Sequence, residues 1–345
     1  MTLFKEASLS SLFQYAIDCL KAGEMVAAGK TLELLEPRLV TESDKGLYRT
    51  ILDRIARSDN PRATSGARLY VDAQHGLSNR IRAMSSGAAI ASATGREFVV
   101  VWQADKHCDC QLSDLFDYQG EVVSRSFVEE ARKTMDVTSY LAIEEGSNRF
   151  GPITLTPGKD AYLRAADEFN SVFSETEAEL AFTRALRPSS AVRDLLRGID
   201  VSDCIGAHVR MEGGPGLDHQ AYDSGDNWPE DEHGLIQQWR EKSHYSRFMR
   251  RIDQLLESGP YSRVFLAADM AETYTAFEQR YGDRLVYLAR EHYDRSAAQL
   301  RHAMADVILL SHTPILLGST WSSFSELAMR LAVAPQTVEF SGRDF

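Results

Sequence analysis

The chain of 345 residues is predicted to be an α/β protein with two facing Rossmann-like domains and an N-terminal helical extension. Three observations predict this fold. Short apolar runs that suit buried parallel strands alternate with amphipathic helical stretches over residues 67–341. Polar, glycine-containing turns follow several of these runs. The first 57 residues, in contrast, show helical periodicity only.

Residues 1–60 are the predicted extension. Apolar residues recur three or four positions apart on either side of Gly23-Glu24 and indicate a helical hairpin: Leu12, Ala16, Cys19, Leu20, Ala27, Ala28, Leu32 and Leu35. One such pair resembles a unit of a tetratricopeptide array, but a solenoid needs about three units. The extension is therefore either a packing appendage on the first domain or a surface for a protein partner. Residues 58–66, rich in turn-forming residues, are the predicted linker.

Residues 61–195 are predicted to form the first α/β domain. It opens with a β-α-β unit over residues 67–102, whose strands are 69–71 and 98–102. The helix between them carries an apolar stripe that ends before Gly95: Leu77, Ile81, Met84, Ala88 and Ala91. The second half of the domain is predicted to hold strands at 122–123 and 141–143 and one long polar helix over 159–187.

The turn that starts the first helix of this unit combines Gly76 with Asn79, Arg80 and Arg82. The glycine lets a ligand approach the backbone closely. Two arginines at a helix N-terminus oppose the helix dipole, so they cost stability unless an anion or a carboxylate answers them. This local conflict indicates a functional turn.

Residues 196–345 are predicted to form the second α/β domain. Its strands are expected at 204–209, 264–268, 285–288, 315–317 and 337–340, with helices between them, as a doubly wound parallel sheet requires. One helix is expected to start at 243–245 and to bury Phe248, Ile252 and Leu255. Such sheets bind ligands at the carboxyl ends of their strands, so the site is predicted there, in a cleft between the two domains.

The first candidate turn of this domain follows the strand at 204–209. His208 and Arg210 stand two residues apart, so they are predicted to share a face at the carboxyl end of the strand. The guanidinium of Arg210 can grip a diphosphate at two points and stays charged at physiological pH. An ion-paired strand end is the alternative.

The second candidate turn follows the strand at 315–317. Gly318 ends the strand, and four hydroxyls then surround Trp321 before a helix begins. The free N–H groups and dipole of that helix, with the hydroxyls of Ser322 and Ser323, would bind phosphate. The alternative is that these two serines only cap the helix.

The composition narrows the class of protein. A net charge of −12 argues against nucleic acid or an anionic membrane as partner. No apolar stretch approaches the roughly 20 residues of a transmembrane helix, and the start lacks a signal-peptide pattern, so a cytoplasmic location is expected. Four cysteines are too few for a disulfide framework. His107-Cys108-Asp109-Cys110 lacks a second cluster, so no metal is expected.

The connection over residues 212–237 is long for a loop between a strand and a helix. It is predicted to be a lid over the part of a site that would hold an acceptor molecule. The reason is that the aromatic rings of Tyr222, Trp228 and Trp239 could stack on a sugar ring. Disorder, or aromatic residues that cover the sheet edge, are the alternatives.

Taken in chain order, these motifs resemble those of the GDP-fucose-dependent transferases, namely the nodulation-type α1,6-fucosyltransferases and the protein O-fucosyltransferases. The resemblance covers roughly residues 67–341 and rests on four short motifs: Gly76-Leu77-Ser78-Asn79-Arg80, His208-Val209-Arg210, Phe265-Leu266-Ala267-Ala268-Asp269 and Ser322-Ser323-Phe324-Ser325. Alanine stands at 268 where the family often has threonine. The resemblance implies a GT-B-like pair of domains, with the acceptor on the first and the nucleotide sugar on the second.

The resemblance also implies an activity. It is that of an inverting, metal-independent glycosyltransferase that moves fucose from GDP-fucose to a hydroxyl of a glycan or glycoconjugate, with no cofactor. Arg210 would hold the donor diphosphate, and Asn79 and Arg80 would position the reacting groups. The other donor-site residues would be His208, Asp269, Ser322, Ser323 and Phe324.

Several roles stay open at this point. Asp269 either accepts hydrogen bonds from the guanine or ribose or caps a helix over 270–281. Asp72, His75 and Glu212 are all candidates for the base that takes the acceptor proton. The chain has no Asp-x-Asp pair to hold a metal. The alternative functions are a transferase of another nucleotide sugar and a non-catalytic protein that binds GDP or a glycan.

Overall fold

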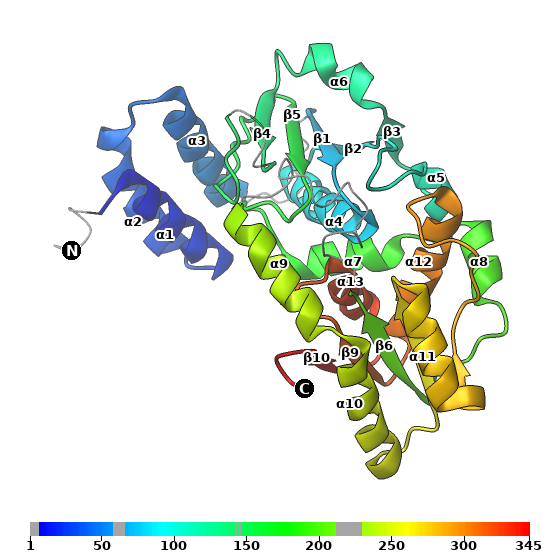
Figure 1. Cartoon of the computed structure of the whole chain (residues 1–345). Coiled ribbons are helices and arrows are strands. Elements are labelled where there is room, and N and C mark those ends of the chain that lie inside the picture. The colour runs from blue at the N-terminus through cyan, green and yellow to red at the C-terminus, as the bar shows by residue number, and fades with distance from the viewer. Residues whose placement is uncertain (1–6, 58–65, 142–143, 145, 212–229) are drawn as a thin grey trace. The chain divides into compact units, whose positions relative to one another are not determined.

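The computed structural model describes residues 7–57, 66–141, 144, 146–211 and 230–345 (Figure 1). These residues fall into two compact units. The first comprises the chain up to residue 75, residues 79–103 and residues 119–183. The second comprises residues 76–78, 104–118 and 184–345. Residues 104–118 and 184–195 thus belong to the second unit although they precede residue 196, and the predicted domain limits stay a prediction.

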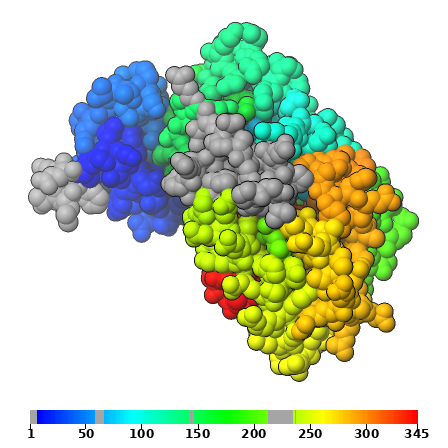
Figure 2. All heavy atoms as spheres, viewed as in Figure 1, coloured from blue at the N-terminus to red at the C-terminus, as the bar shows by residue number. Residues whose placement is uncertain are grey.

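The N-terminal extension contains three helices rather than the predicted hairpin: α1 (Leu9–Lys21), α2 (Met25–Leu35) and α3 (Glu42–Arg57), with the short 3-10 helix η2 (Glu36–Arg38) after α2. Their side chains are blue in Figure 2. The predicted stripe is buried except for the half-buried Ala27. The break lies at Gly23, whose φ is 78°.

Contacts from helices α3 and α1 join this extension to the rest of the first unit. The Oγ1 of Thr50 accepts a hydrogen bond from the backbone N of Leu155 at 2.9 Å, and both residues are buried. The Nζ of Lys21 donates to the side chain of Asn170 at 3.3 Å. These contacts support the interpretation of the extension as a packing appendage; a partner surface on it stays a prediction.

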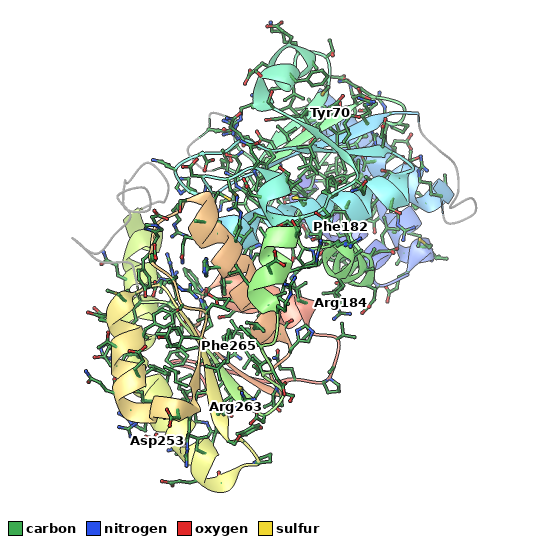
Figure 3. The ribbon with its side chains drawn as sticks, turned by 90° about the vertical axis from the view of Figure 1, so that its right-hand side faces the viewer. Tyr70, Phe182, Arg184, Asp253, Arg263 and Phe265 are labelled. Carbon is green, nitrogen blue, oxygen red and sulfur yellow. The ribbon has the colours of Figure 1, made fainter. Side chains whose placement is uncertain are left out.

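The first unit holds a sheet of five parallel strands in the order β3-β2-β1-β5-β4. The strands are β1 (Arg68–Ala73), β2 (Glu97–Val101), β3 (Glu121–Val123), β4 (Asp136–Ser139) and β5 (Ala161–Ala165). Helices α4 (Leu77–Thr94) and α6 (Arg125–Ala131) follow β1 and β3. The core of the sheet includes Tyr70 of β1 (Figure 3).

Helix α4 confirms the predicted β-α-β unit. It ends before Gly95, whose φ is 62°, and its predicted stripe is buried apart from the half-buried Ala88. Gly87 lets the helix approach the sheet, because a Cβ at this position would lie 2.3 Å from Cγ2 of Val71 in β1.

One prediction for the second half of this unit is wrong. The long helix over 159–187 does not exist, because residues 161–165 form β5 in the sheet and only Thr176–Ala185 form a helix, α7. Arg164 interrupts the apolar run of β5 and hides its strand pattern. The strand expected at 141–143 falls mostly on residues 142–143, which lie outside the described residues, and it stays a prediction.

The second unit holds a sheet of five parallel strands in the order β10-β9-β6-β7-β8. All five were predicted: β6 (Cys204–Val209), β7 (Arg263–Ala268), β8 (Leu285–Val286), β9 (Ile315–Gly318) and β10 (Thr337–Phe340). The helices are α5 (Leu112–Leu115), α8 (Ser190–Leu196), α9 (Glu230–Lys242), α10 (Tyr245–Ser258), α11 (Ala271–Tyr281), α12 (Ala297–Ser311) and α13 (Ser323–Leu331), with the 3-10 helix η3 (Gly282–Arg284) before β8.

The predicted face of α10 packs into this core through Phe248, Ile252 and Leu255. Phe265 of β7 lies inside the unit and is fully buried (Figure 3). None of the helices that the structure describes is long and apolar enough to span a lipid bilayer.

Each sheet has one point at which the strand order reverses. In the first unit it lies between β1 and β5, and in the second between β6 and β9. Open α/β sheets bind ligands at the carboxyl ends of the strands on either side of such a point. Both sheets therefore have the two-sided winding of Rossmann-like domains. A ligand site is expected at the carboxyl ends of β1 and β5 in the first sheet and of β6 and β9 in the second.

Candidate functional site

The reversal point of the second unit is where β6 meets the turn after β9. His208 in β6 is 5% exposed, and its Nδ1 lies 2.7 Å from Oγ of Ser325 in α13. Its ring stacks on Phe324 with 4.5 Å between the centroids. Burial lowers the pKa of His208 to about 3, so the imidazole is neutral at physiological pH. His208 thus joins β6 to α13 as an uncharged clamp.

Arg210 lies just beyond β6. Its Nη1 is 3.3 Å from Oδ2 of Asp269, at the end of the neighbouring strand β7. The Oδ1 of Asp269 accepts a hydrogen bond from the backbone N of Met211 at 3.1 Å. Helix α11 begins at Ala271 with Met270 as its N-cap residue, so Asp269 does not cap it. Arg210 is therefore part of an ion-paired strand end, and Asp269 is held beside it.

The turn after β9 is tied to β6 through Ser319. The Oγ of this serine accepts a hydrogen bond from the backbone N of Arg210 and donates one to the carbonyl of His208, both at 2.9 Å. Its own N–H donates to Oγ of Ser325 at 3.1 Å. The sequence prediction missed Ser319 and Ser325, although both hydroxyls belong to the predicted serine-rich turn.

The same turn is tied to the other neighbouring strand, β10, through Thr320. Its Oγ1 donates to the carbonyl of Ser341 at 2.6 Å, and its N–H donates to Oγ of Ser341 at 3.4 Å. The Oγ of Ser341 lies 2.7 Å from Oγ of Ser243. All three residues are buried. The turn is therefore fixed from both sides before any ligand binds.

Helix α13 starts at this turn with Ser322 as its N-cap residue. The side chain of Ser322 makes no capping hydrogen bond, so the structure does not support a purely capping role for its hydroxyl. The first helical hydrogen bond runs from the N–H of Glu326 to the carbonyl of Ser322 at 3.2 Å. The N–H groups of Ser323, Phe324 and Ser325 precede it, and such groups bind anions at helix N-termini.

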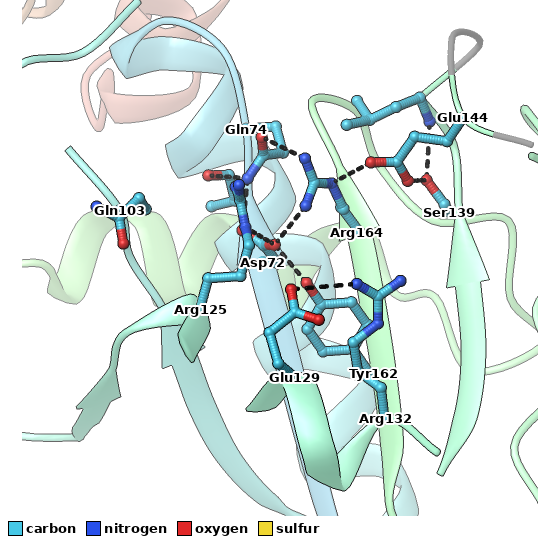
Figure 4. Close-up of polar contacts among 12 residues, drawn as sticks. Asp72, Gln74, Gln103, Arg125, Glu129, Arg132, Ser139, Glu144, Tyr162 and Arg164 are labelled. Atoms are coloured by element: carbon cyan, nitrogen blue, oxygen red, sulfur yellow. Dashed lines mark hydrogen bonds and ion pairs between the residues drawn. The ribbon is translucent and has the colours of Figure 1, made fainter. Parts of the chain in front are cut away.

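The reversal point of the first unit holds a different cluster, drawn in Figure 4. Asp72 of β1 is fully buried. Its Oδ2 accepts hydrogen bonds from the hydroxyl of Tyr162, from Nε of Arg125 at 3.1 Å and from Nη1 of Arg164 at 3.2 Å. Its Oδ1 accepts from the amide of Gln74. Burial raises the pKa of the Tyr162 hydroxyl, which stays protonated and donates.

Arg164 extends this cluster along the sheet edge. Its Nη2 donates to Oε1 of Gln74 at 3.3 Å, and its Nε lies 2.8 Å from Oε1 of Glu144. The second oxygen of Glu144 accepts from the hydroxyl of Ser139, at the end of β4. The sequence prediction named Asp72 but missed Arg164, which it had placed in a helix.

The turn between β1 and α4 carries the remaining predicted residues of this unit. His75 is half-buried and has a φ of 62°. Arg80 is fully buried; its Nε donates to the carbonyl of His75 and its Nη1 to the carbonyl of Gln103, both at 2.7 Å. Its guanidinium carbon lies 4.8 Å from the centroid of the Trp102 ring. Arg80 therefore fixes the backbone of the turn.

Asn79 and Arg82 are three positions apart in α4, so their side chains are neighbours on the helix surface. The Nη2 of Arg82 donates to Oδ1 of Asn79 at 3.2 Å and to Oδ1 of Asp167 at 2.6 Å. Of the two arginines that oppose the helix dipole, Arg82 is thus paired with a carboxylate of the protein, that of Asp167. The half-buried Asn79 is oriented by Arg82.

Two other predicted features have simple outcomes. All four cysteines are buried free thiols, and Sγ of Cys108 lies 3.7 Å from Sγ of Cys110. Within the described ranges there is no group of three or more His, Cys, Asp or Glu side chains that could hold a metal ion. Residues 212–229, including Glu212 and most of the predicted lid, lie outside the described residues.

Comparison with known proteins gives a structural likeness only. No protein-family model matches the sequence, and no curated protein matches it. A structure of NodZ α-1,6-fucosyltransferase soaked with GDP-fucose aligns with a TM-score of 0.51 and 14% identity over 77% of this chain and 93% of that one. A second structure, of fucosyltransferase NodZ from Bradyrhizobium, aligns with the same score and identity over 76% and 93%.

A structure of POFUT1 in complex with GDP aligns over 81% of this chain and 100% of that one, with 14% identity and a TM-score of 0.49. The NodZ structures are those of fucosyltransferases, as the motifs predicted. At 14% identity, the likeness shows the fold. This chain is therefore similar in fold to NodZ and has its GT-B-like, two-domain α/β architecture.

Proposed function

We propose that the protein is an inverting, metal-independent glycosyltransferase that moves fucose from GDP-fucose to a hydroxyl of a glycan or glycoconjugate. One observation carries the proposal. Arg210, Asp269 and the open N-terminus of α13 lie at the carboxyl ends of three adjacent strands, at the reversal point of a Rossmann-like sheet. The fold it shares with a NodZ structure soaked with GDP-fucose supports fucose as the transferred sugar.

The order of the strands assigns each part of the donor a place in this proposal. Asp269 directly follows β7, where Rossmann-like domains carry the acidic residue that binds a ribose. Arg210 follows β6, the next strand, and would grip the diphosphate. Ser322, Ser323 and the N–H groups around Phe324 would bind the phosphate that carries the sugar. His208 holds Phe324 and Ser325 in place for this.

The chemistry of the transfer follows from charge. The acceptor oxygen attacks the anomeric carbon from the face opposite GDP, the bond from that carbon to the phosphate oxygen breaks, and negative charge grows on the leaving diphosphate. Arg210 and the N-terminal N–H groups of α13 would stabilise that charge more in the transition state than in the ground state. The hydrogen bonds of Ser319 and Thr320 fix the turn beforehand, so little reorganisation is needed.

For the base that takes the acceptor proton, the geometry favours His75 over Asp72. Asp72 is fully buried and already accepts four hydrogen bonds. His75 is half-buried at the carboxyl end of β1. Arg80 would act as a positioning residue because it binds the carbonyl of His75. Asn79 would orient the acceptor. A His75→Asn variant, whose side chain tolerates the positive φ, should keep donor affinity and lose turnover.

The test is thermal unfolding with GDP, UDP, ADP and GDP-fucose, each with and without magnesium. Ligand at a hundred times its dissociation constant stabilises by about 2.7 kcal/mol, or roughly 5–10 °C. We expect a rise for the guanine nucleotides alone, independent of magnesium and absent in Arg210→Ala. Arg263→Ala is the matched control. Arg263, which is labelled in Figure 3, lies at the amino end of β7 and pairs with Asp203. Asp269 follows the other end of the same strand.

Each other outcome assigns a different function. A rise for UDP but not for GDP would move the protein to another nucleotide sugar. Binding of GDP-fucose without release of GDP, for any hydroxyl acceptor tried, would indicate a non-catalytic binding protein. No response to any nucleotide would overturn the donor site itself.

A further inference from the structure

Trp321 stands out within the turn after β9. It is one of three non-glycine residues with a positive φ in the described chain, at 57°. Within residues 319–325 it is the exposed residue, at 49%, whereas Thr320 and Ser322 on either side are 9% and 6% exposed. An aromatic side chain in this backbone region is uncommon and strained.

The surroundings of Trp321 hold this backbone in place. Thr320 is bonded to Ser341 through both its N–H and its hydroxyl, and Ser319 is bonded to β6. On the other side, Ser322 already accepts the first hydrogen bond of α13. A strained conformation that its neighbours impose on both sides is typical of functional sites. It results in a large, half-exposed aromatic ring beside the N-terminus of α13.

The strand order indicates which part of a ligand this ring would meet. Asp269, Arg210 and Trp321 follow β7, β6 and β9, and these are consecutive strands of the sheet. If the ribose lies at Asp269 and the diphosphate at Arg210, the group on the far phosphate lies on the β9 side. For a nucleotide sugar, that group is the sugar to be transferred. This step rests on the proposed function.

We propose that Trp321 is the platform for the transferred sugar, which it recognises through the apolar C–H face of a deoxyhexose ring. A flat indole suits such a face, because aromatic surfaces bury apolar area with little loss of side-chain entropy. A methyl group in place of a hydroxymethyl group at the end of the sugar adds apolar contact and removes a hydroxyl that the ring could not satisfy. Trp321 therefore contributes to selection of the sugar and not of the nucleotide.

The experiment compares the affinities for GDP and GDP-fucose, measured by titration calorimetry, in the wild type and two variants. Trp321→Asn removes the ring with a residue that tolerates positive φ, and Trp321→Phe keeps an aromatic face. We expect Trp321→Asn to bind GDP-fucose about tenfold more weakly, which corresponds to roughly 1.4 kcal/mol, and to bind GDP within about twofold of the wild type. Trp321→Phe should retain most of the affinity for the sugar nucleotide.

Circular dichroism and thermal unfolding show whether each variant is folded. Equal affinity of the wild type and Trp321→Asn for GDP-fucose would overturn the role of Trp321 and leave the proposed function intact. Equal loss of GDP and GDP-fucose affinity would also overturn it, because the ring would then support only the turn. A wild type that binds neither GDP nor GDP-fucose would overturn the proposed function together with this inference.

Discussion

The two sheets reverse their strand order in the same way, but the polar groups at the two reversal points differ. In the first unit, a fully buried Asp72 accepts hydrogen bonds from Tyr162, Gln74 and two arginines, so its charge is answered within the protein. In the second unit, the turn after β9 is fixed by neutral hydroxyls, and the first N–H groups of α13 are not used by the helix. The charge at the first point is thus paired within the protein, whereas the second point has N–H donors at the start of α13 that the helix does not use. The same topology supports the fold in the first unit, and under the proposed function it would bind the donor in the second.

The largest effect that tests this difference is on stability. Asp72→Ala should destabilise the protein by about 3–5 kcal/mol, because it leaves two guanidinium groups around a buried position without their carboxylate. Chemical denaturation followed by circular dichroism measures it. Asp72→Asn keeps the volume and separates the loss of charge from the loss of packing. A change below 1 kcal/mol for Asp72→Ala would mean that the cluster is not a stabilising core and would reopen Asp72 as a catalytic group.

The next effect falls on activity and concerns the second unit. Under the proposed function, Arg210→Ala should lower kcat/KM by about a hundredfold to a thousandfold, because Arg210 would be the cation that stabilises the leaving diphosphate. The free energy of unfolding should fall by less than in Asp72→Ala, because the variant breaks one ion pair and Asp269 keeps its hydrogen bond from the backbone N of Met211. Release of GDP from GDP-fucose with a hydroxyl acceptor is the readout. Arg210→Lys keeps the charge but not the planar fork and should be intermediate.

A third prediction concerns pH and the neutral clamp of the second unit. Burial lowers the pKa of His208 to about 3, below the value of about 6.5 that it has when unfolded. The native state then binds fewer protons than the unfolded state, so the contribution of His208 to stability is complete above pH 6.5 and is lost as the pH falls toward 3. Asp269 opposes this shift of the pKa, and Arg210 and Arg240 add to it.

The variant His208→Asn isolates this contribution. Its amide can replace the Nδ1 contact with Ser325 but does not titrate. The free energy of unfolding of both proteins is measured from pH 8 to pH 4. As the pH falls, the wild type should lose more of this free energy than the variant does. A difference that does not depend on pH would show that His208 has the same pKa in the folded and unfolded states and is therefore solvated.

The same comparison shows what sequence reasoning can reach. The strands of the second unit were predictable because β6, β7 and β9 are apolar runs buried on both faces. Such a run can be recognised from its own residues, without knowing which strands lie beside it. Strand β5 was missed because Arg164 breaks its run. The charge of that arginine is paired with Asp72, which is 92 positions away in the chain, so the local sequence does not explain it.

The candidate site divides in a similar way. The place of Arg210 after a strand and the place of Ser322 at a helix start were predictable, because both follow from local patterns. The roles of Ser319 and Ser341 depend on partners 111 and 98 positions away, and a serine carries no sign of such a partner. The three-helix form of the extension was missed for the same reason, since α3 is fixed by Thr50 and Leu155, 105 positions apart.

The smallest expected effect comes from an ion pair that belongs to neither reversal point. Arg263 binds Asp203 through Nε at 2.9 Å at the amino end of β7, but both side chains are about one-third exposed, at 33% and 38%. Water and salt screen such a pair, so Arg263→Ala should change the free energy of unfolding by about 0–1 kcal/mol. Its affinity for GDP should equal that of the wild type, because no donor-site strand end is involved. If Arg263→Ala instead destabilised the protein as strongly as Asp72→Ala does, burial would not be what separates the two clusters, and the strength of arginine–carboxylate pairs alone would explain both.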